Sequence, residues 1–123
     1  LEFRRVLFLS IDLVMYVSRD CTPATIQVKT KEKPSPAGGT GKPSLGWFFP
    51  DACPAQWLAF CDLSTDSAWL FTIDEARELA QQHNAKGQRQ LYWYIDDPAP
   101  KGARTQAEME RYRVEAVAER LAL

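Results

Sequence analysis

The stretch that most constrains the fold lies at residues 11–32, which read IDLVMYVSRDCTPATIQVKTKE. Residues 11–17 are apolar and rich in strand-forming side chains, whereas residues 18–23 contain Ser, Asp and Pro, which favour a turn. Residues 25–31 alternate between polar and apolar side chains. Because successive side chains of a strand face opposite sides of a sheet, the pattern predicts a hairpin whose second strand has one polar face.

That polar face carries the side chains of chemical interest. Gln27 and Lys29 lie two residues apart on it, and the preceding strand opens with Asp12. We therefore expect a carboxylate, an amide oxygen and an ammonium group to converge on one point. The alternative is an ordinary hairpin whose Lys and Gln side chains are solvated.

These residues resemble the motif of the PD-(D/E)xK nuclease superfamily, the restriction-endonuclease-like fold that includes Holliday-junction resolvases. The matching residues are Asp12 and Gln27-Val28-Lys29, and Gln27 stands where the family usually has an acid. The resemblance implies metal-dependent hydrolysis of phosphodiester bonds in DNA. Asp12, Gln27 and the Val28 carbonyl would hold Mg²⁺ or Mn²⁺ through oxygen ligands. Lys29 would orient the attacking water or stabilise charge on the phosphate.

Two other functions remain open. Gln27 is neutral and a weaker metal ligand than a carboxylate, so one alternative is a catalytically degenerate DNA-binding or structural module. The 15 basic and 16 acidic residues give a net charge of −1, so no global basic field indicates a nucleic-acid partner. A small regulatory or interaction domain without a nucleic-acid role is therefore the second alternative.

Length and composition place further bounds. A chain of 123 residues is long enough for one domain with a real core. It has no apolar run of about 18 residues, so we expect no membrane partner. The three cysteines lack the spacing of a zinc knuckle or a redox pair, which suits a cytoplasmic protein. No glycine-rich phosphate loop, GxSxG or HExxH motif is present, which argues against a nucleotide-hydrolysing enzyme, a serine hydrolase and a zinc protease.

The first ten residues, LEFRRVLFLS, resemble the translation of a common sequencing adapter that has Arg in place of Leu9. We therefore expect residues 1–10 to be a non-native leader and residues 11–123 to form a single endonuclease-like domain. On this interpretation the domain is truncated and lacks the N-terminal helix of the family. The alternative is a genuine strand at residues 3–9.

Residues 33–44 contain several Pro and Gly residues and predict a mobile loop. Lys31, Lys33 and Lys42 are candidates for binding the phosphate backbone of DNA, and the alternative is a solvated linker. In the aromatic cluster that follows, Trp47 is a candidate for stacking on a base, although such rings more often cover a core. We expect Phe48 to lie in the core.

The remaining elements follow from local patterns. Residues 55–63 are apolar on both faces and predict a central strand, and residues 68–72 and 90–95 predict two more. Asp62 is expected to serve the turn after its strand. Thr72 and Glu75 form a capping-box pattern that predicts a helix over residues 73–82, with His83 at its end. A second such pattern, Thr105 and Glu108, predicts a helix over residues 106–121.

The order of these elements predicts an α/β or α+β fold with a mixed central β-sheet flanked by helices, an endonuclease-like core. The resemblance implies DNA as the partner. It also implies a homodimer, because nucleases of this class often need two sites to cut both strands.

Overall fold

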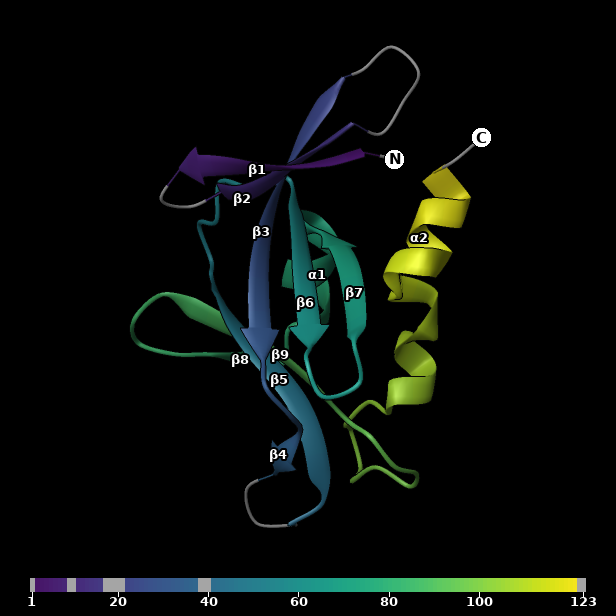
Figure 1. Ribbon diagram of the computed structural model, residues 1–123. Helices are drawn as coiled ribbons and strands as arrows, with labels where there is room; N and C mark the ends of the chain where they lie inside the picture. Colours follow the sequence, from purple (N-terminus) through teal and green to yellow (C-terminus); the bar gives the residue numbers. More distant parts are fainter. Residues whose placement is uncertain (1, 9–10, 17–21, 38–40, 122–123) are drawn as a thin grey trace.

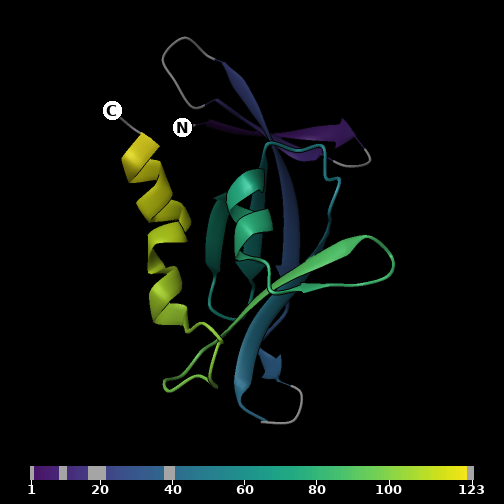
Figure 2. The ribbon, with the colours of Figure 1, turned by 180° about the vertical axis from the view of Figure 1, so that it is seen from behind.

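The chain folds into two β-sheets, with helices packed on the larger one (Figures 1 and 2). A computed structural model describes the backbone of residues 2–8, 11–16, 22–37 and 41–121, and the side chains of residues 13–16, 22–37 and 41–121. The predicted α+β fold with a mixed sheet flanked by helices is confirmed. The second sheet is a feature that the sequence patterns did not indicate.

The larger sheet has five strands in the order β1-β2-β3-β6-β7. Neighbouring strands are antiparallel except β3 and β6, which run parallel and make the sheet mixed. The residues expected to be a leader supply the backbone of β1, and their non-native origin stays a prediction. The strand bounds are β1 (Glu2–Phe8), β2 (Ile11–Tyr16), β3 (Pro23–Lys31), β6 (Trp57–Asp62) and β7 (Ser67–Thr72).

The predicted hairpin is formed by β2 and β3. The two strands pair from Tyr16 opposite Pro23 to Leu13 opposite Ile26. Ile26 is the last residue of β3 that pairs with β2 and the first that pairs with β6, where it lies opposite Trp57. The first half of β3 thus holds the hairpin, and its second half lies beside the central strand.

The second sheet has four antiparallel strands in the order β4-β5-β9-β8. Its longest pairing joins β5 to β9, from Ser44 opposite Tyr94 to Pro50 opposite Gln88. Part of the region expected to be loop therefore forms β4 and the start of β5, whereas residues 38–40 lie outside the described residues. The strand bounds are β4 (Ser35–Pro36), β5 (Pro43–Pro50), β8 (Gln82–His83) and β9 (Gln88–Tyr94).

An aromatic core holds the two sheets together. The ring of Trp47 from β5 stacks on Phe60 from β6, with centroids 5.0 Å apart and planes inclined by 6°. Trp69 from β7 meets Trp93 from β9 edge-on at 5.0 Å. Aromatic pairs in these geometries add to the free energy gained by burying their large apolar surfaces.

The pleat of β5 decides which of its aromatic side chains enter this core. Leu45, Trp47 and Phe49 point inward and are at most 4% exposed, whereas Phe48 points outward and is 48% exposed. The structure therefore corrects the expectation that Phe48 lies in the core. Because side chains alternate along a strand, burying Trp47 places Phe48 on the opposite face.

Helix α1 (Ile73–Leu79) begins with the predicted capping box. The Glu75 N–H donates to Thr72 Oγ1 at 3.1 Å, and the Thr72 N–H donates to the Glu75 carboxylate at 2.9 Å. The helix is shorter than predicted, because the Gln81 N–H donates to the Gln90 carbonyl at 3.0 Å and joins the chain to the second sheet. His83 consequently lies in β8 and not at a helix end.

The predicted last helix is two helices. The 3₁₀-helix η2 (Gln106–Tyr112) ends at Arg113, whose φ of −56° and ψ of 143° leave the helical region. Arg113 instead bridges to Trp69 of β7, and α2 (Val114–Leu121) follows. Among the described residues no helix is long and apolar enough to cross a membrane.

The helices cover opposite faces of the larger sheet. Ala76 of α1 packs in the aromatic core, which lies on one face. Val117 of α2 packs with Ile26 and Leu70 on the other face. The register places Gln27 and Lys29 on the face of the aromatic core, because they lie opposite two of its members (Leu58 and Phe60).

The pleat of β5 makes a matched pair of variants informative. We expect Phe49→Ala to lower the free energy of unfolding by about 3–5 kcal/mol, because it leaves a cavity in the core. We expect Phe48→Ala to change it by about 0.5 kcal/mol or less, because surface substitutions rarely do more. Urea denaturation followed by tryptophan fluorescence measures both. Equal losses in the two variants would contradict the assigned pleat.

Candidate functional site

The candidate site begins on β3, where three polar side chains share one face. Gln27, Lys29 and Lys31 alternate with Val28 and Thr30 along the strand. Gln27 and Lys29 are half-buried, whereas a solvated polar face would leave both largely exposed. The sequence therefore places an amide and an ammonium group at the margin of an apolar core.

Asp12 is related to Gln27 through the register of the hairpin. The β2–β3 pairs end with Leu13 opposite Ile26. Continuing this antiparallel register by one residue puts backbone position 12 opposite position 27, and opposed residues share a face of the sheet. By this extension of the register the three motif positions would share one face of the sheet. The Asp12 side chain lies outside the described residues.

The donor atoms available here determine which metal the site suits. Among the described side chains, no group of three or more His, Cys, Asp or Glu residues is placed to hold a metal ion. The candidate ligands are instead the Asp12 carboxylate, the Gln27 amide oxygen and the Val28 carbonyl, which are all oxygen donors. Oxygen ligands fit Mg²⁺ or Mn²⁺ and do not favour a zinc site.

The predicted DNA-binding lysines do not form one cluster. Lys31 Nζ donates to Ser35 Oγ at 3.0 Å, at the end of β3. Lys42 Nζ donates to the Pro98 carbonyl at 2.9 Å, which ties it to the loop after β9. Lys33 is exposed in the turn between β3 and β4. Of the three, Lys31 lies nearest in sequence to the motif and on its face of β3.

The structure corrects the prediction that Trp47 stacks on a base. Trp47 is 4% exposed, and one face of its ring is covered by Phe60. Trp69 and Trp93 also contact it, with centroids 6.2 and 5.2 Å away. No nucleic-acid base can reach this ring in the folded protein, so its role is in the core.

Asp62 is confirmed as a turn residue. It is 2% exposed, and its carboxylate accepts hydrogen bonds from the Ser64 N–H at 3.0 Å, the Ser64 hydroxyl at 2.7 Å and the Thr65 hydroxyl at 3.1 Å. Although it lies opposite Lys31 in the sheet, its oxygen atoms are engaged in the turn. It is therefore not a candidate ligand.

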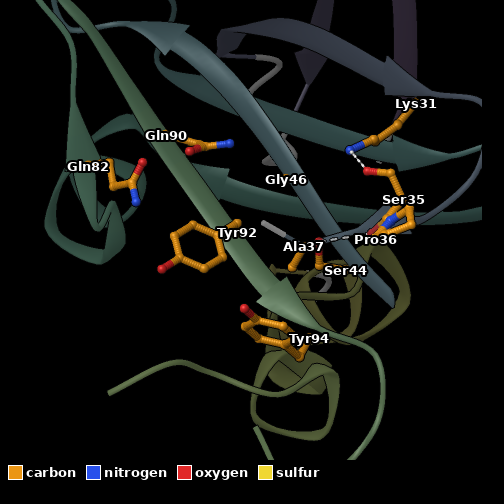
Figure 3. Close-up of a pocket in the computed structure, with 10 residues that line it drawn as sticks. All are labelled: Lys31, Ser35, Pro36, Ala37, Ser44, Gly46, Gln82, Gln90, Tyr92 and Tyr94. Atoms are coloured by element: carbon orange, nitrogen blue, oxygen red, sulfur yellow. Dashed lines mark hydrogen bonds between the residues drawn. The ribbon is translucent and has the colours of Figure 1, made fainter. Parts of the chain in front are cut away.

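A groove of about 320 Å³ extends from Lys31 across the outer face of the second sheet (Figure 3). Gly46 lies in the middle of its lining, and a Cβ atom at this position would come within 2.8 Å of the Tyr92 Cβ. The lining is polar and contains amide, hydroxyl and phenol groups. It consists of Lys31, Ser35, Pro36, Ala37, Ser44, Gly46, Gln82, Gln90, Tyr92 and Tyr94.

Sequence reasoning missed this groove. Its signal was the alternation of Gln90, Tyr92 and Tyr94 in β9, whose other parity (Leu91 and Trp93) is fully buried. That alternation points to a strand with one accessible face. The pairing with β5 that makes the face a groove joins residues about 45 positions apart, and local pattern does not predict such a pairing.

A charged cluster fixes the second sheet to the loop after β5. Arg89 Nε donates to the Asp51 carboxylate, and Arg77 Nε donates to the Asp51 carbonyl at 3.0 Å. The Arg89 guanidinium also reaches the Arg77 carbonyl at 3.0 Å. The hydrogen bond from Arg89 is the main cause that holds the pKa of Asp51 below its ordinary value of 3.8.

Comparison with known proteins gives one informative similarity. No protein-family model matches the chain, and no curated protein matches it. Among solved structures, the chain is similar to that of a bacterial homing endonuclease, I-Ssp6803I, with a TM-score of 0.59 and 15% sequence identity. The similarity covers 98% of this chain and 79% of the other. At this identity it shows the fold, so the chain has a nuclease-like α+β fold.

The Asp51–Arg89 pair predicts a pH dependence of stability. Because the pKa of Asp51 is lower in the folded chain than in the unfolded chain, the stabilisation is fully present above about pH 5 and is lost as the pH falls through the folded-state value. Denaturation curves from pH 6 to pH 2 measure this dependence. We expect Asp51→Asn and Arg89→Gln each to reduce the loss of stability at low pH. An unchanged profile in both variants would contradict the pairing.

Proposed function

We propose that this chain is a metal-dependent DNA endonuclease whose active site lies on β3. The observation that supports it best is the placement of Gln27 and Lys29, half-buried on one face of the mixed sheet, with position 12 next in register. These are the motif positions that resemble those of PD-(D/E)xK nucleases. The fold resembles that of a homing endonuclease.

The metal would be held by Asp12, Gln27 and the Val28 carbonyl. When bound, Mg²⁺ or Mn²⁺ lowers the pKa of a bound water molecule and acts as a Lewis acid toward phosphate. Of these protein ligands only Asp12 is charged. Because Mg²⁺ in such sites is usually bound by one or two carboxylates together with substrate phosphates, we expect the DNA itself to contribute to metal affinity.

Lys29 would act on the phosphate or on the attacking water. It lies opposite Phe60, at the margin of the aromatic core. Among the described residues no hydrogen bond or ion pair occupies its ammonium group. Charge interactions are stronger at a partly desolvated position than in water. Lys29 is thus suited to stabilise the negative charge that builds on the phosphate in the transition state.

One observation favours a second candidate function. Gln27 is neutral, so the site has one negative charge fewer than a site with an acid at this position. A chain that kept the fold and lost metal affinity would act as a DNA-binding module. Metal-dependent cleavage separates this candidate from the nuclease.

The nuclease predicts a specific pattern of cleavage. Plasmid and branched DNA should be cut in Mg²⁺ or Mn²⁺ and left intact in EDTA. Lys29→Ala should lower the cleavage rate by about 100-fold or more, a loss typical when a charge-stabilising group is removed. Asp12→Ala should abolish cleavage. Lys101→Ala is the matched control, because Lys101 is an exposed lysine in the loop after β9, away from β3 in the chain.

The outcomes separate the candidates. Cleavage that is lost in Lys29→Ala and Asp12→Ala but kept in Lys101→Ala supports the nuclease and its site together. DNA binding without cleavage in any metal identifies the degenerate module. If all variants cut DNA equally well, the active site is not on β3.

A further inference from the structure

The hairpin formed by β8 and β9 lies at one side of the protein, and its second strand is paired with β5 on the side away from β8. In Figures 1 and 2 the hairpin projects to the side of the molecule away from α2. Its tip and first strand, residues 82–87, are exposed throughout. None of these residues belongs to the hydrophobic core, so packing does not account for their side chains.

The composition of this hairpin suits one kind of partner. The sequence from Leu79 to Ile95 contains no acidic residue but has His83, Lys86 and Arg89. Its other polar side chains are amides, from Gln81, Gln82, Asn84, Gln88 and Gln90. Gln and Asn pair with adenine and Arg and Lys with guanine at the major-groove edges of base pairs, so the hairpin concentrates base-reading side chains. The neighbouring Asp51 carboxylate accepts a hydrogen bond from Arg89, which offsets its charge.

Several of these side chains hold the hairpin rigid. The Asn84 side-chain oxygen accepts from the N–H groups of Lys86 at 2.9 Å and Gln88 at 3.1 Å, which closes the tip. The Gln81 amide bonds to both backbone groups of Tyr92, at 2.8 and 3.2 Å, which extends the strand pairing. Preorganisation of this kind lowers the entropy lost on binding.

Other side chains have no such structural task. Gln82 and Gln90 lie opposite each other in the β8–β9 register, and both line the groove. Among the described residues neither side-chain amide has a hydrogen-bond partner, and the same holds for the Lys86 ammonium group. The hairpin therefore presents two adjacent amides and one cation to solvent, on a rigid frame.

We propose that the β8–β9 hairpin enters the major groove of duplex DNA and reads base pairs through Gln82 and Gln90, with Lys86 on a phosphate. This inference rests on the proposed function, because it takes DNA as the substrate. The major groove, which is about 12 Å wide, would take the hairpin from its tip and from the free edge of β8, because β5 flanks β9 on the other side. The amide pair would read adenine, and Lys86 at the tip would contact a phosphate.

The groove connects this hairpin to the candidate active site. Gln82 and Gln90 lie at one end of the lining, and Lys31 lies at the other, two residues from Lys29 on the same face of β3 (Figure 3). A duplex held by the hairpin would thus pass a polar surface that leads to the motif strand. On this proposal reading takes place at the hairpin and chemistry on β3, with Lys31 in the groove lining between them.

The test measures DNA binding in EDTA, so that it does not depend on cleavage. Selection from a duplex library with random sequence supplies the probe. We expect Lys86→Ala to weaken binding to all sequences and to reduce the slope of log K against log salt by about 1. Gln82→Ala combined with Gln90→Ala should weaken binding to the selected sequence about tenfold or more and relax its sequence preference. Lys101→Ala is the control, since Lys101 is an exposed lysine in the loop after β9.

A chemical substitution in the DNA tests which groove is read. Replacing adenine N7 by carbon in the selected duplex removes a major-groove acceptor. We expect this change to weaken DNA binding by the wild-type protein but not by the variant that combines Gln82→Ala with Gln90→Ala. An RNA duplex of the same sequence should bind more weakly, because its major groove is too narrow for side chains to read.

The failures of the two proposals are distinguishable. Equal DNA binding by the hairpin variants, Lys101→Ala and the wild type would overturn the hairpin proposal even if the protein cuts DNA. Hairpin-dependent binding without metal-dependent cleavage would support the hairpin proposal and overturn the nuclease. No binding to any duplex would overturn the hairpin proposal, and cleavage of single-stranded DNA would then show whether the nuclease survives. Circular dichroism verifies that each variant is folded.

Discussion

The stacking of Trp47 on Phe60 is the contact on which the rest of the arrangement depends. Trp47 belongs to β5 and Phe60 to β6, so this pair joins the two sheets. Lys29 lies opposite Phe60 in the parallel pairing of β3 with β6. The same contact that seals the core therefore sets where the motif strand lies relative to the second sheet. It also fixes the pleat of β5, which places Gly46 in the groove.

Much of the larger sheet was predictable because its signals are local. The alternation in residues 25–31 identified β3 and the face that Gln27 and Lys29 share. The Thr72–Glu75 capping box identified the start of α1. In each case the decisive interaction joins residues within a few positions of one another, so a short window of sequence contains it.

The features that were not predicted depend on distant partners. The pattern of the segment GWFFP did not predict a strand, because its pairing with β9 joins residues far apart in the chain. Phe48 and Trp47 are both large and apolar, so only that pairing decides which of them is buried. The ends of the helices follow the same rule: α1 stops where Gln81 pairs with Gln90, and the last helix breaks where Arg113 bridges to Trp69.

The candidate site also has one part that was predictable from sequence and one part that was not. The motif positions could be proposed from sequence because a nuclease-like pattern is short and lies on two adjacent strands. The groove and the projecting hairpin were not predicted, because the role of their polar side chains depends on a surface that distant strands form together. The groove reaches β3 at Lys31, so the surface proposed for reading and the strand proposed for chemistry meet at that residue.

The central claim is that β3 carries a metal-dependent site for phosphodiester hydrolysis. The most direct test is to titrate Mn²⁺ by electron paramagnetic resonance, with and without duplex DNA. Our account predicts weak binding alone, tighter binding when DNA phosphate completes the coordination, and loss of both in Asp12→Asn and Gln27→Leu. Mn²⁺ affinity that is unchanged in both variants would contradict it, because the metal would then be held elsewhere or bound only to DNA.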